Sequence, residues 1–184
     1  MHVFKKFVKY YKPYQSVFWM DMFCALLVSA VDLAFPQILN WATKDLFAHG
    51  AQAIYRILPW MAIGLLVMYF LRFLGRYYIT YQGHVMGARM ESDMRQDLFD
   101  HFQRLSFSYY DRNNTGEMMS KLVSDLFDIS ELAHHGPENI FISLLKILGS
   151  FALLLWINVP MTLILAAVTL IMLLFCIDQN KKMR

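Results

Sequence analysis

Four long apolar segments dominate this sequence and restrict the folds that are open to it. They run over residues 17–42, 58–81, 140–157 and 159–177. A helix of about 20 apolar residues crosses the roughly 30 Å hydrocarbon core of a bilayer, where an unpaired backbone amide finds no partner. Each segment is therefore predicted to be a transmembrane helix, and the expected fold class is an all-α membrane protein with long helices.

The overall composition favours the same class and disfavours others. Of 184 residues, 58% are hydrophobic and 16% aromatic, which exceeds the roughly half-apolar average of soluble domains. The net charge of +3 is spread along the chain, so no basic patch for nucleic acid is predicted. Cys24 and Cys176 lie in separate apolar segments and predict no disulfide framework. The lipid bilayer is the partner that composition predicts.

Residues 1–15 precede the first apolar segment and have a different pattern. Phe4, Phe7, Val8 and Tyr11 recur at helical spacing, while lysines occupy another face. This pattern predicts an amphipathic helix that lies in the membrane interface before the membrane domain of residues 16–184. A frayed tail with chance spacing is the alternative.

The distribution of basic residues predicts the topology. If the N-terminus is cytosolic, Lys44 and Arg56 lie on the outer side, and the other basic residues outside the apolar segments lie in the cytosol. Cytoplasmic loops carry the excess of lysine and arginine in most membrane proteins. We therefore expect a multi-pass protein of the cytoplasmic membrane with both termini in the cytosol.

The charged middle of the chain predicts a cytoplasmic helical hairpin over residues 82–139. No proline occurs from Trp60 to Leu105, and an apolar ridge that includes Met90 and Met94 continues the helical period beyond the second apolar segment. Such a helix is about 70 Å long, more than twice the membrane core. It must project into the cytosol, turn at its tip and return as a second amphipathic helix.

The tip of this hairpin has the composition of a docking surface. Phe107, Tyr109 and Tyr110 are bulky aromatic residues at the predicted bend. Aromatic residues are enriched among the buried anchors of protein interfaces. We predict that another protein or domain contacts this tip.

The segment RQDLFDHFQRLSFSYYDRNNTGEMMSKLVSDLFDISEL resembles the first intracellular loop of ABC transporters of the exporter type. The pattern combines an arginine, Leu-Phe, an aromatic pair with aspartate, Thr-Gly-Glu, a basic residue and Ser-Asp. It is matched by Arg95, Leu98, Phe99, Leu105, Tyr109, Tyr110, Asp111, Thr115, Gly116, Glu117, Lys121, Ser124 and Asp125. Lys121 stands where arginine is more usual.

The resemblance implies the first four of six helices of a half-transporter, similar to multidrug and lipid exporters. Such a protein works as a homodimer or heterodimer and moves a small-molecule or lipid substrate. A nucleotide-binding domain, in the same chain or a separate one, couples through a short helix that corresponds here to Ser106–Asn114. The implied coupling residues are Phe107, Tyr109, Tyr110, Asp111 and Arg112.

The sequence has no motif for nucleotide chemistry. G-x-x-x-x-G-K-[ST] is absent, and no serine, histidine and aspartate spacing indicates a catalytic site. We therefore expect no catalytic or cofactor-binding residue in this chain and no ATP hydrolysis by it alone. ATP and Mg²⁺ are implied only for the nucleotide-binding domain, and we expect the chain to be an N-terminal fragment of a longer protein.

Ionisable residues within the apolar segments are candidates for the substrate path. Asp32, Arg72 and Arg76 lie in predicted spans, where such groups usually face a bundle interior or an aqueous cavity. A path for anionic or amphipathic cargo is one interpretation. Hydrogen bonds between helices, or arginines that reach the headgroups, are the other, and Lys146 is expected to be structural.

The pair His134-His135, near Glu131 and Glu138, suggests a metal site, but its spacing argues against one. Adjacent helical residues point about 100° apart, no HExxH motif occurs, and Gly136-Pro137 is expected to break the helix. No metal site is predicted, and His84 and His101 are expected to be solvated. A second functional hypothesis also stands: a self-sufficient four-span channel or sensor whose cytosolic hairpin binds a partner.

Overall fold

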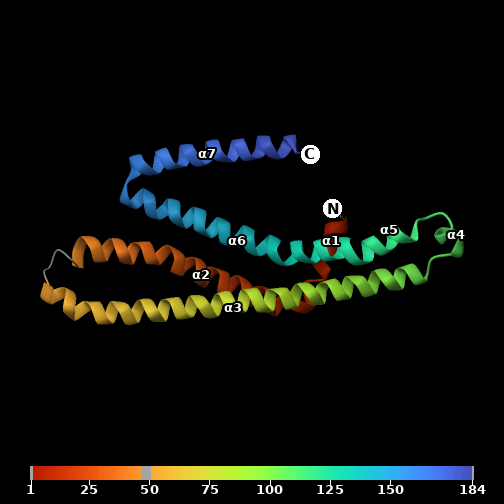
Figure 1. Ribbon diagram of the computed structural model, residues 1–184, viewed down its shortest axis with the longest axis horizontal. Coiled ribbons are helices and arrows are strands. Elements are labelled where there is room, and N and C mark those ends of the chain that lie inside the picture. Colours follow the sequence, from red (N-terminus) through yellow and green to blue (C-terminus); the bar gives the residue numbers. More distant parts are fainter. Residues whose placement is uncertain (1, 47–50, 184) are drawn as a thin grey trace. The chain divides into compact units, whose positions relative to one another are not determined.

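The computed structural model describes residues 2–46 and 51–183, and side chains within 6–44 and 54–183. The described residues form helices joined by short turns, with no strand among them (Figure 1). In chain order the elements are α1 (His2–Lys9), η1 (Lys12–Tyr14), α2 (Gln15–Trp41), η2 (Ala42–Leu46), α3 (Ala51–Gln103), α4 (Phe107–Tyr110), α5 (Thr115–Ser120), η4 (Lys121–Asp125), α6 (Leu126–Ile157) and α7 (Val159–Lys182).

The predicted fold class is confirmed. Four helical stretches of the described chain are long and apolar enough to cross a membrane: Lys6–Lys44, Ile54–Gln103, Thr115–Ile157 and Val159–Lys182. Each contains one of the four apolar segments predicted from the sequence. The long unbroken helix is α3, which continues well beyond the apolar part of its sequence.

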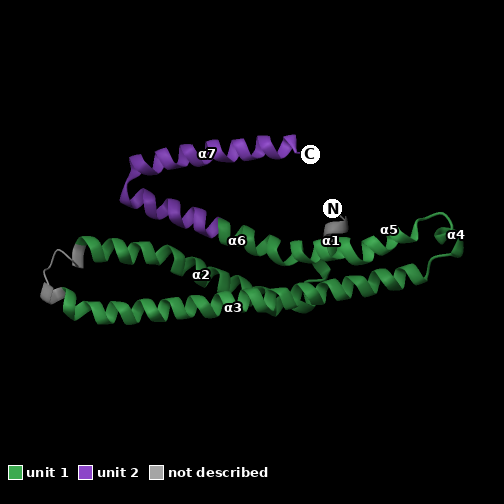
Figure 2. Cartoon of the chain, viewed as in Figure 1, with its two compact units in different colours: residues 1–143 green, residues 144–184 purple. Residues whose placement is uncertain are grey.

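The chain divides into two compact units, residues 1–143 and 144–184, coloured separately in Figure 2. The second unit contains the end of α6 and all of α7. These two helices meet at Asn158, whose side chain accepts a hydrogen bond from the Met161 amide at 3.1 Å and caps α7. Pro160 follows at the start of α7, where a missing N–H costs no helical hydrogen bond.

Helices α2 and α3 lie side by side in the first unit (Figure 1) and share a small apolar core. The core consists of Cys24, Ala25, Val28 and Ile79. Gly75 permits the close approach, since a Cβ atom there would lie 3.2 Å from the Val28 side chain. Small residues at such contacts bring helix backbones together where burial from water provides no driving force.

The N-terminal segment packs against the part of α3 beyond its apolar stretch and against the start of α6. Met86, Met90 and Ala133 form the buried centre of this second core, and Phe7, Tyr11 and other aromatic residues of the N-terminal segment pack around it. The Tyr10 hydroxyl donates to Asp97 at 2.7 Å. Burial raises the pKa of Tyr10 to about 12, and the bond to Asp97 adds to the increase, so Tyr10 keeps the proton that it donates.

The prediction that Gly136-Pro137 breaks the helix is wrong, because α6 runs through both residues. Proline has no N–H, so Pro137 cannot donate the usual helical bond to the carbonyl of Ala133. The Tyr11 hydroxyl donates to that carbonyl instead, at 2.6 Å. The N-terminal segment thus supplies the hydrogen bond that the proline removes.

Tyr11→Phe is expected to reduce the free energy of unfolding by about 1–3 kcal/mol, because it leaves a buried carbonyl without a partner. In a Pro137→Ala background the restored N–H bonds to Ala133, so the same substitution should cost less than half as much. Chemical unfolding of the purified protein in detergent measures both values.

Tyr10→Phe is the matched control for this experiment, since its hydroxyl bonds to a side chain of α3 and its cost should not depend on residue 137. If Tyr11→Phe costs the same in both backgrounds, Tyr11 does not compensate for the proline.

Candidate functional site

The tip of the helical hairpin is a short ordered structure between α3 and α5. The Tyr110 hydroxyl donates to the Phe102 carbonyl at 2.5 Å and ties α4 to the end of α3. Asn113 donates to the Tyr109 carbonyl at 2.8 Å. On the other side, Asn114 caps α5 by accepting from the Gly116 amide at 2.8 Å. These bonds hold α4 in a defined place at the end of the hairpin.

The five residues predicted as coupling contacts divide into two groups in the structure. Phe107 is 91% exposed and Tyr109 is 40% exposed, and Asp111 and Arg112 are also at the surface. Tyr110 is only partly exposed, and its hydroxyl bonds within the hairpin. The tip therefore presents one large unpartnered aromatic side chain beside charged groups, while Tyr110 secures the tip from within.

The two arms of the hairpin are connected below the tip. Arg95 of α3 forms an ion pair with Glu91 on its own helix and also donates from Nε to the Leu122 carbonyl at 3.1 Å. Leu122 lies in the π-helical turn η4, where the wider backbone spacing departs from the α-helical hydrogen-bond ladder. Ser130 extends the connection with a 3.4 Å contact to Glu91. These contacts link the two arms of the hairpin at two places.

The charged residues predicted for the substrate path do not form one group. Arg72 donates from Nε to Asp32 at 2.7 Å, which joins α3 to α2 within the predicted spans. The Arg72 guanidinium also lies 5.9 Å from the centre of the Tyr69 ring. Arg76, one turn further along, instead lines a polar pocket of about 450 Å³ together with His84, His134 and other residues. The structure shows an interhelical ion pair, and the substrate-path role stays a prediction.

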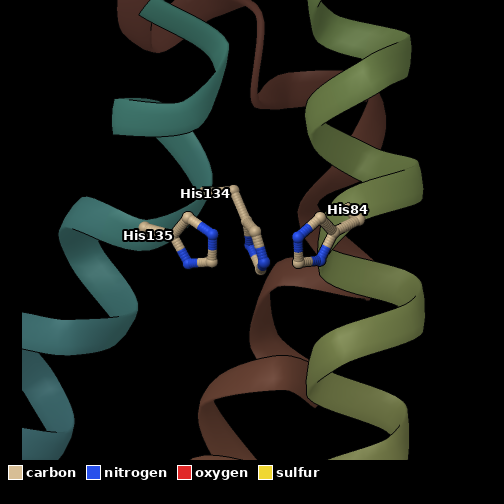
Figure 3. Close-up of side chains that lie close together, drawn as sticks. All are labelled: His84, His134 and His135. Carbon is tan, nitrogen blue, oxygen red and sulfur yellow. The ribbon is translucent and has the colours of Figure 1, made fainter. Parts of the chain in front are cut away.

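Three histidines meet between α3 and α6 in this pocket (Figure 3). The ring centres of His84 and His134 are 5.0 Å apart, those of His84 and His135 are 5.2 Å apart, and those of His134 and His135 are 4.5 Å apart. His84 is exposed, as the sequence predicts, but its contact with the adjacent pair was not predicted. The sequence signal for this contact is Gly83, next to His84. Glycine has no side chain, so another helix can pack closely against α3 at this position.

Comparison with known proteins identifies the class. Residues 18–184 match the family model for the ABC transporter transmembrane region, which covers most of the chain. The chain therefore belongs to this family, and its relatives place it with the exporter type.

Two relatives come from Bacillus subtilis (strain 168). One, called an uncharacterized ABC transporter ATP-binding protein YwjA, is 41% identical over 179 residues, 97% of this chain and 31% of the relative. The other, a putative multidrug export ATP-binding/permease protein YgaD, is 28% identical over 89% of this chain and 29% of its own length.

A third relative is an ATP-dependent lipid A-core flippase from Thiobacillus denitrificans (strain ATCC 25259 / T1). It is 24% identical over 183 residues, which cover all of this chain and 31% of the relative. The chain thus spans about a third of the length of these relatives, and it matches their transmembrane part.

The Asp32–Arg72 pair can be tested by a double-mutant cycle. Asp32→Ala and Arg72→Ala, alone and combined, should show a coupling energy of roughly 0.5–2 kcal/mol in unfolding experiments in detergent, as polar contacts between membrane helices do. The cycle of Asp32→Ala with Arg76→Ala is the control and should be additive. Equal coupling in the two cycles would contradict the pairing seen here.

Gly83→Ala should lower the free energy of unfolding by about 1–3 kcal/mol, because a Cβ atom at Gly83 would overlap the His134 ring. Gly64 lies in the same helix with no atom within 4 Å of such a Cβ, so Gly64→Ala should be neutral or stabilising by up to about 1 kcal/mol. Thermal unfolding of both variants compares them, and equal effects would rule out close packing at Gly83.

Proposed function

We propose that this chain is the permease part of an ATP-driven exporter and receives force from a nucleotide-binding domain at α4. The observation that carries the proposal is the tip itself: Phe107 is 91% exposed on a short helix that hydrogen bonds hold in place. The desolvation free energy of an aromatic side chain is small when a partner covers it. Such a side chain can fill a pocket of the partner and act as an interface anchor.

The connections below the tip give this surface a mechanical role. A push on α4 reaches α3 through Tyr110 and reaches the return arm through the bond of Arg95 to Leu122. Both arms continue as helices into apolar, membrane-crossing segments. Packed helices shift between discrete arrangements instead of deforming smoothly, so a displacement at the tip changes the arrangement of the spans.

The proposal assigns the chemistry to other parts of the complete transporter. ATP and Mg²⁺ bind and react in the nucleotide-binding domain, and this chain alone does not hydrolyse ATP. Two half-transporters, identical or related, form the pathway in the cytoplasmic membrane, with both termini of this chain in the cytosol. The names of two relatives, a putative multidrug export protein and a lipid A-core flippase, support a small-molecule or lipid substrate of amphipathic character.

The test is co-purification of this chain with a nucleotide-binding domain, using that of the Bacillus subtilis relative of 41% identity as the partner. The wild-type chain should retain the domain, and Phe107→Ala should reduce retention at least tenfold. A tenfold reduction corresponds to a loss of about 1.4 kcal/mol of binding free energy, which a small interface anchor provides. Phe127→Ala is the matched control, because this residue is 53% exposed on the return arm and outside the tip.

Two results would contradict the proposal. One is equal retention of the domain by the wild type and the Phe107→Ala variant. The other is a chain that retains no domain and forms a stable, discrete oligomer alone, which would favour the four-span channel or sensor.

A further inference from the structure

We propose that His84, His134 and His135 form a binding site for one divalent transition-metal ion of the zinc class. The site joins α3 to α6 at the base of the cytosolic hairpin (Figure 3). The proposal rests on the positions of these side chains and does not depend on the transport function.

The donor atoms are close enough for one ion. One ring nitrogen from each of the three histidines lies within 4.8 Å of the other two. In a tetrahedral zinc site with Zn–N bonds of about 2.0–2.1 Å, two donors are about 3.4 Å apart. The His135 side chain is 41% exposed, and rotation about its side-chain bonds would bring its nitrogen toward that spacing.

His134 is the buried residue at the centre of the proposed site. Its side chain is only 2% exposed, and neither ring nitrogen has a hydrogen-bond partner within the described residues. A buried polar atom without a partner is unfavourable and rare in folded proteins. Burial also disfavours the charged ring, so a nitrogen lone pair of His134 is available to a metal ion.

His84 is oriented as metal-binding histidines commonly are. Its Nδ1 lies 2.6 Å from the Thr80 carbonyl oxygen. A carbonyl oxygen only accepts hydrogen bonds, so Nδ1 carries the proton and Nε2 has the lone pair. A backbone carbonyl that holds the other ring nitrogen fixes both the tautomer and the ring orientation of a ligand.

The charges around the cluster favour a cation. Asp21 and Glu138 form a second group of possible ligands with His134, within the same 4.8 Å limit. Glu131 lies 3.5 Å from Nε2 of His135. Among the residues that line the pocket, Arg76 and Glu138 carry opposite charges, and Asp21 and Glu131 add two carboxylates beside His134 and His135. Imidazole ligands select zinc, copper, nickel and related ions over magnesium and calcium, which prefer oxygen.

The backbone is shaped to bring the three rings together. A Cβ atom at Gly83 would occupy the place of the His134 ring, and one at Gly87 would lie 3.6 Å from the His134 Cβ and the Ser130 carbonyl. The ring of His134 therefore lies directly on α3, next to His84. A bound ion would cross-link the two helices at this point and restrict their separation.

The experiment titrates the full chain, purified in detergent with its affinity tag removed, with Zn²⁺ against a chromogenic chelator. The wild type should bind one ion with an affinity at least tenfold higher than that of His84→Ala or His135→Ala. His101→Ala is the matched control, since this histidine lies on the same helix α3 but outside the cluster, and its affinity should equal that of the wild type.

A second readout separates ligation from folding. Zn²⁺ should raise the thermal unfolding temperature of the wild type and of His101→Ala, but not that of the two cluster variants. His135 is 41% exposed, so its substitution leaves the core intact even if His84→Ala does not fold. Wild-type affinity in the folded His135→Ala variant, or the same loss in His101→Ala, would overturn the proposal, as would weak Zn²⁺ binding that is equal in all four proteins.

Discussion

The close contact of α6 with α3 at Gly83 and Gly87 is the constraint on which the helical hairpin and the N-terminal segment depend. Both glycines face His134 and its neighbours, which lets the return arm cross α3 without an intervening side chain. The same crossing lies beside Ala133, whose carbonyl receives the Tyr11 hydroxyl at 2.6 Å. One small region therefore brings together the N-terminal segment, the outgoing arm and the returning arm.

This arrangement supports a long helical hairpin along its length. A helix that projects from a membrane has few neighbours, and its own hydrogen bonds do not prevent it from bending. Here four side-chain hydrogen bonds support the outgoing arm α3 along its length. Tyr14 donates to Asp93 and Tyr10 to Asp97. Arg95 donates to the Leu122 carbonyl, and Tyr110 donates to the Phe102 carbonyl at the tip. Apart from Arg95, these supports are phenolic hydroxyl groups, which combine a rigid apolar ring with one directional bond.

The sequence predicts most of the fold because local periodicity and length determine it. The four spans, the overlong helix and the aromatic tip all follow from patterns within single segments. The errors concern contacts between distant segments. The predicted break at Gly136-Pro137 failed because Tyr11, 122 positions away, supplies the missing hydrogen bond. The contact of His84 with His134 and His135 was not predicted, because no spacing rule connects a residue of α3 to a pair on α6.

The two arginines of α3 in and near the predicted span, Arg72 and Arg76, each lie near acidic or polar groups of a neighbouring helix. Within the predicted spans, Arg72 and Asp32 meet at 2.7 Å, so the charge of each is balanced by a neighbouring helix. One turn further along α3, Arg76 borders the polar pocket, where Glu138 lies near His134 and His135. Along α3 the polar groups thus change from an interhelical ion pair to a pocket that Arg76 and Glu138 line together with three histidines. A cation bound by the histidines, as proposed, would join α3 to α6 through His84. Glu131 and Glu138, which lie 3.5–3.8 Å from the nitrogens of His134 and His135 on the same helix, would offset its charge.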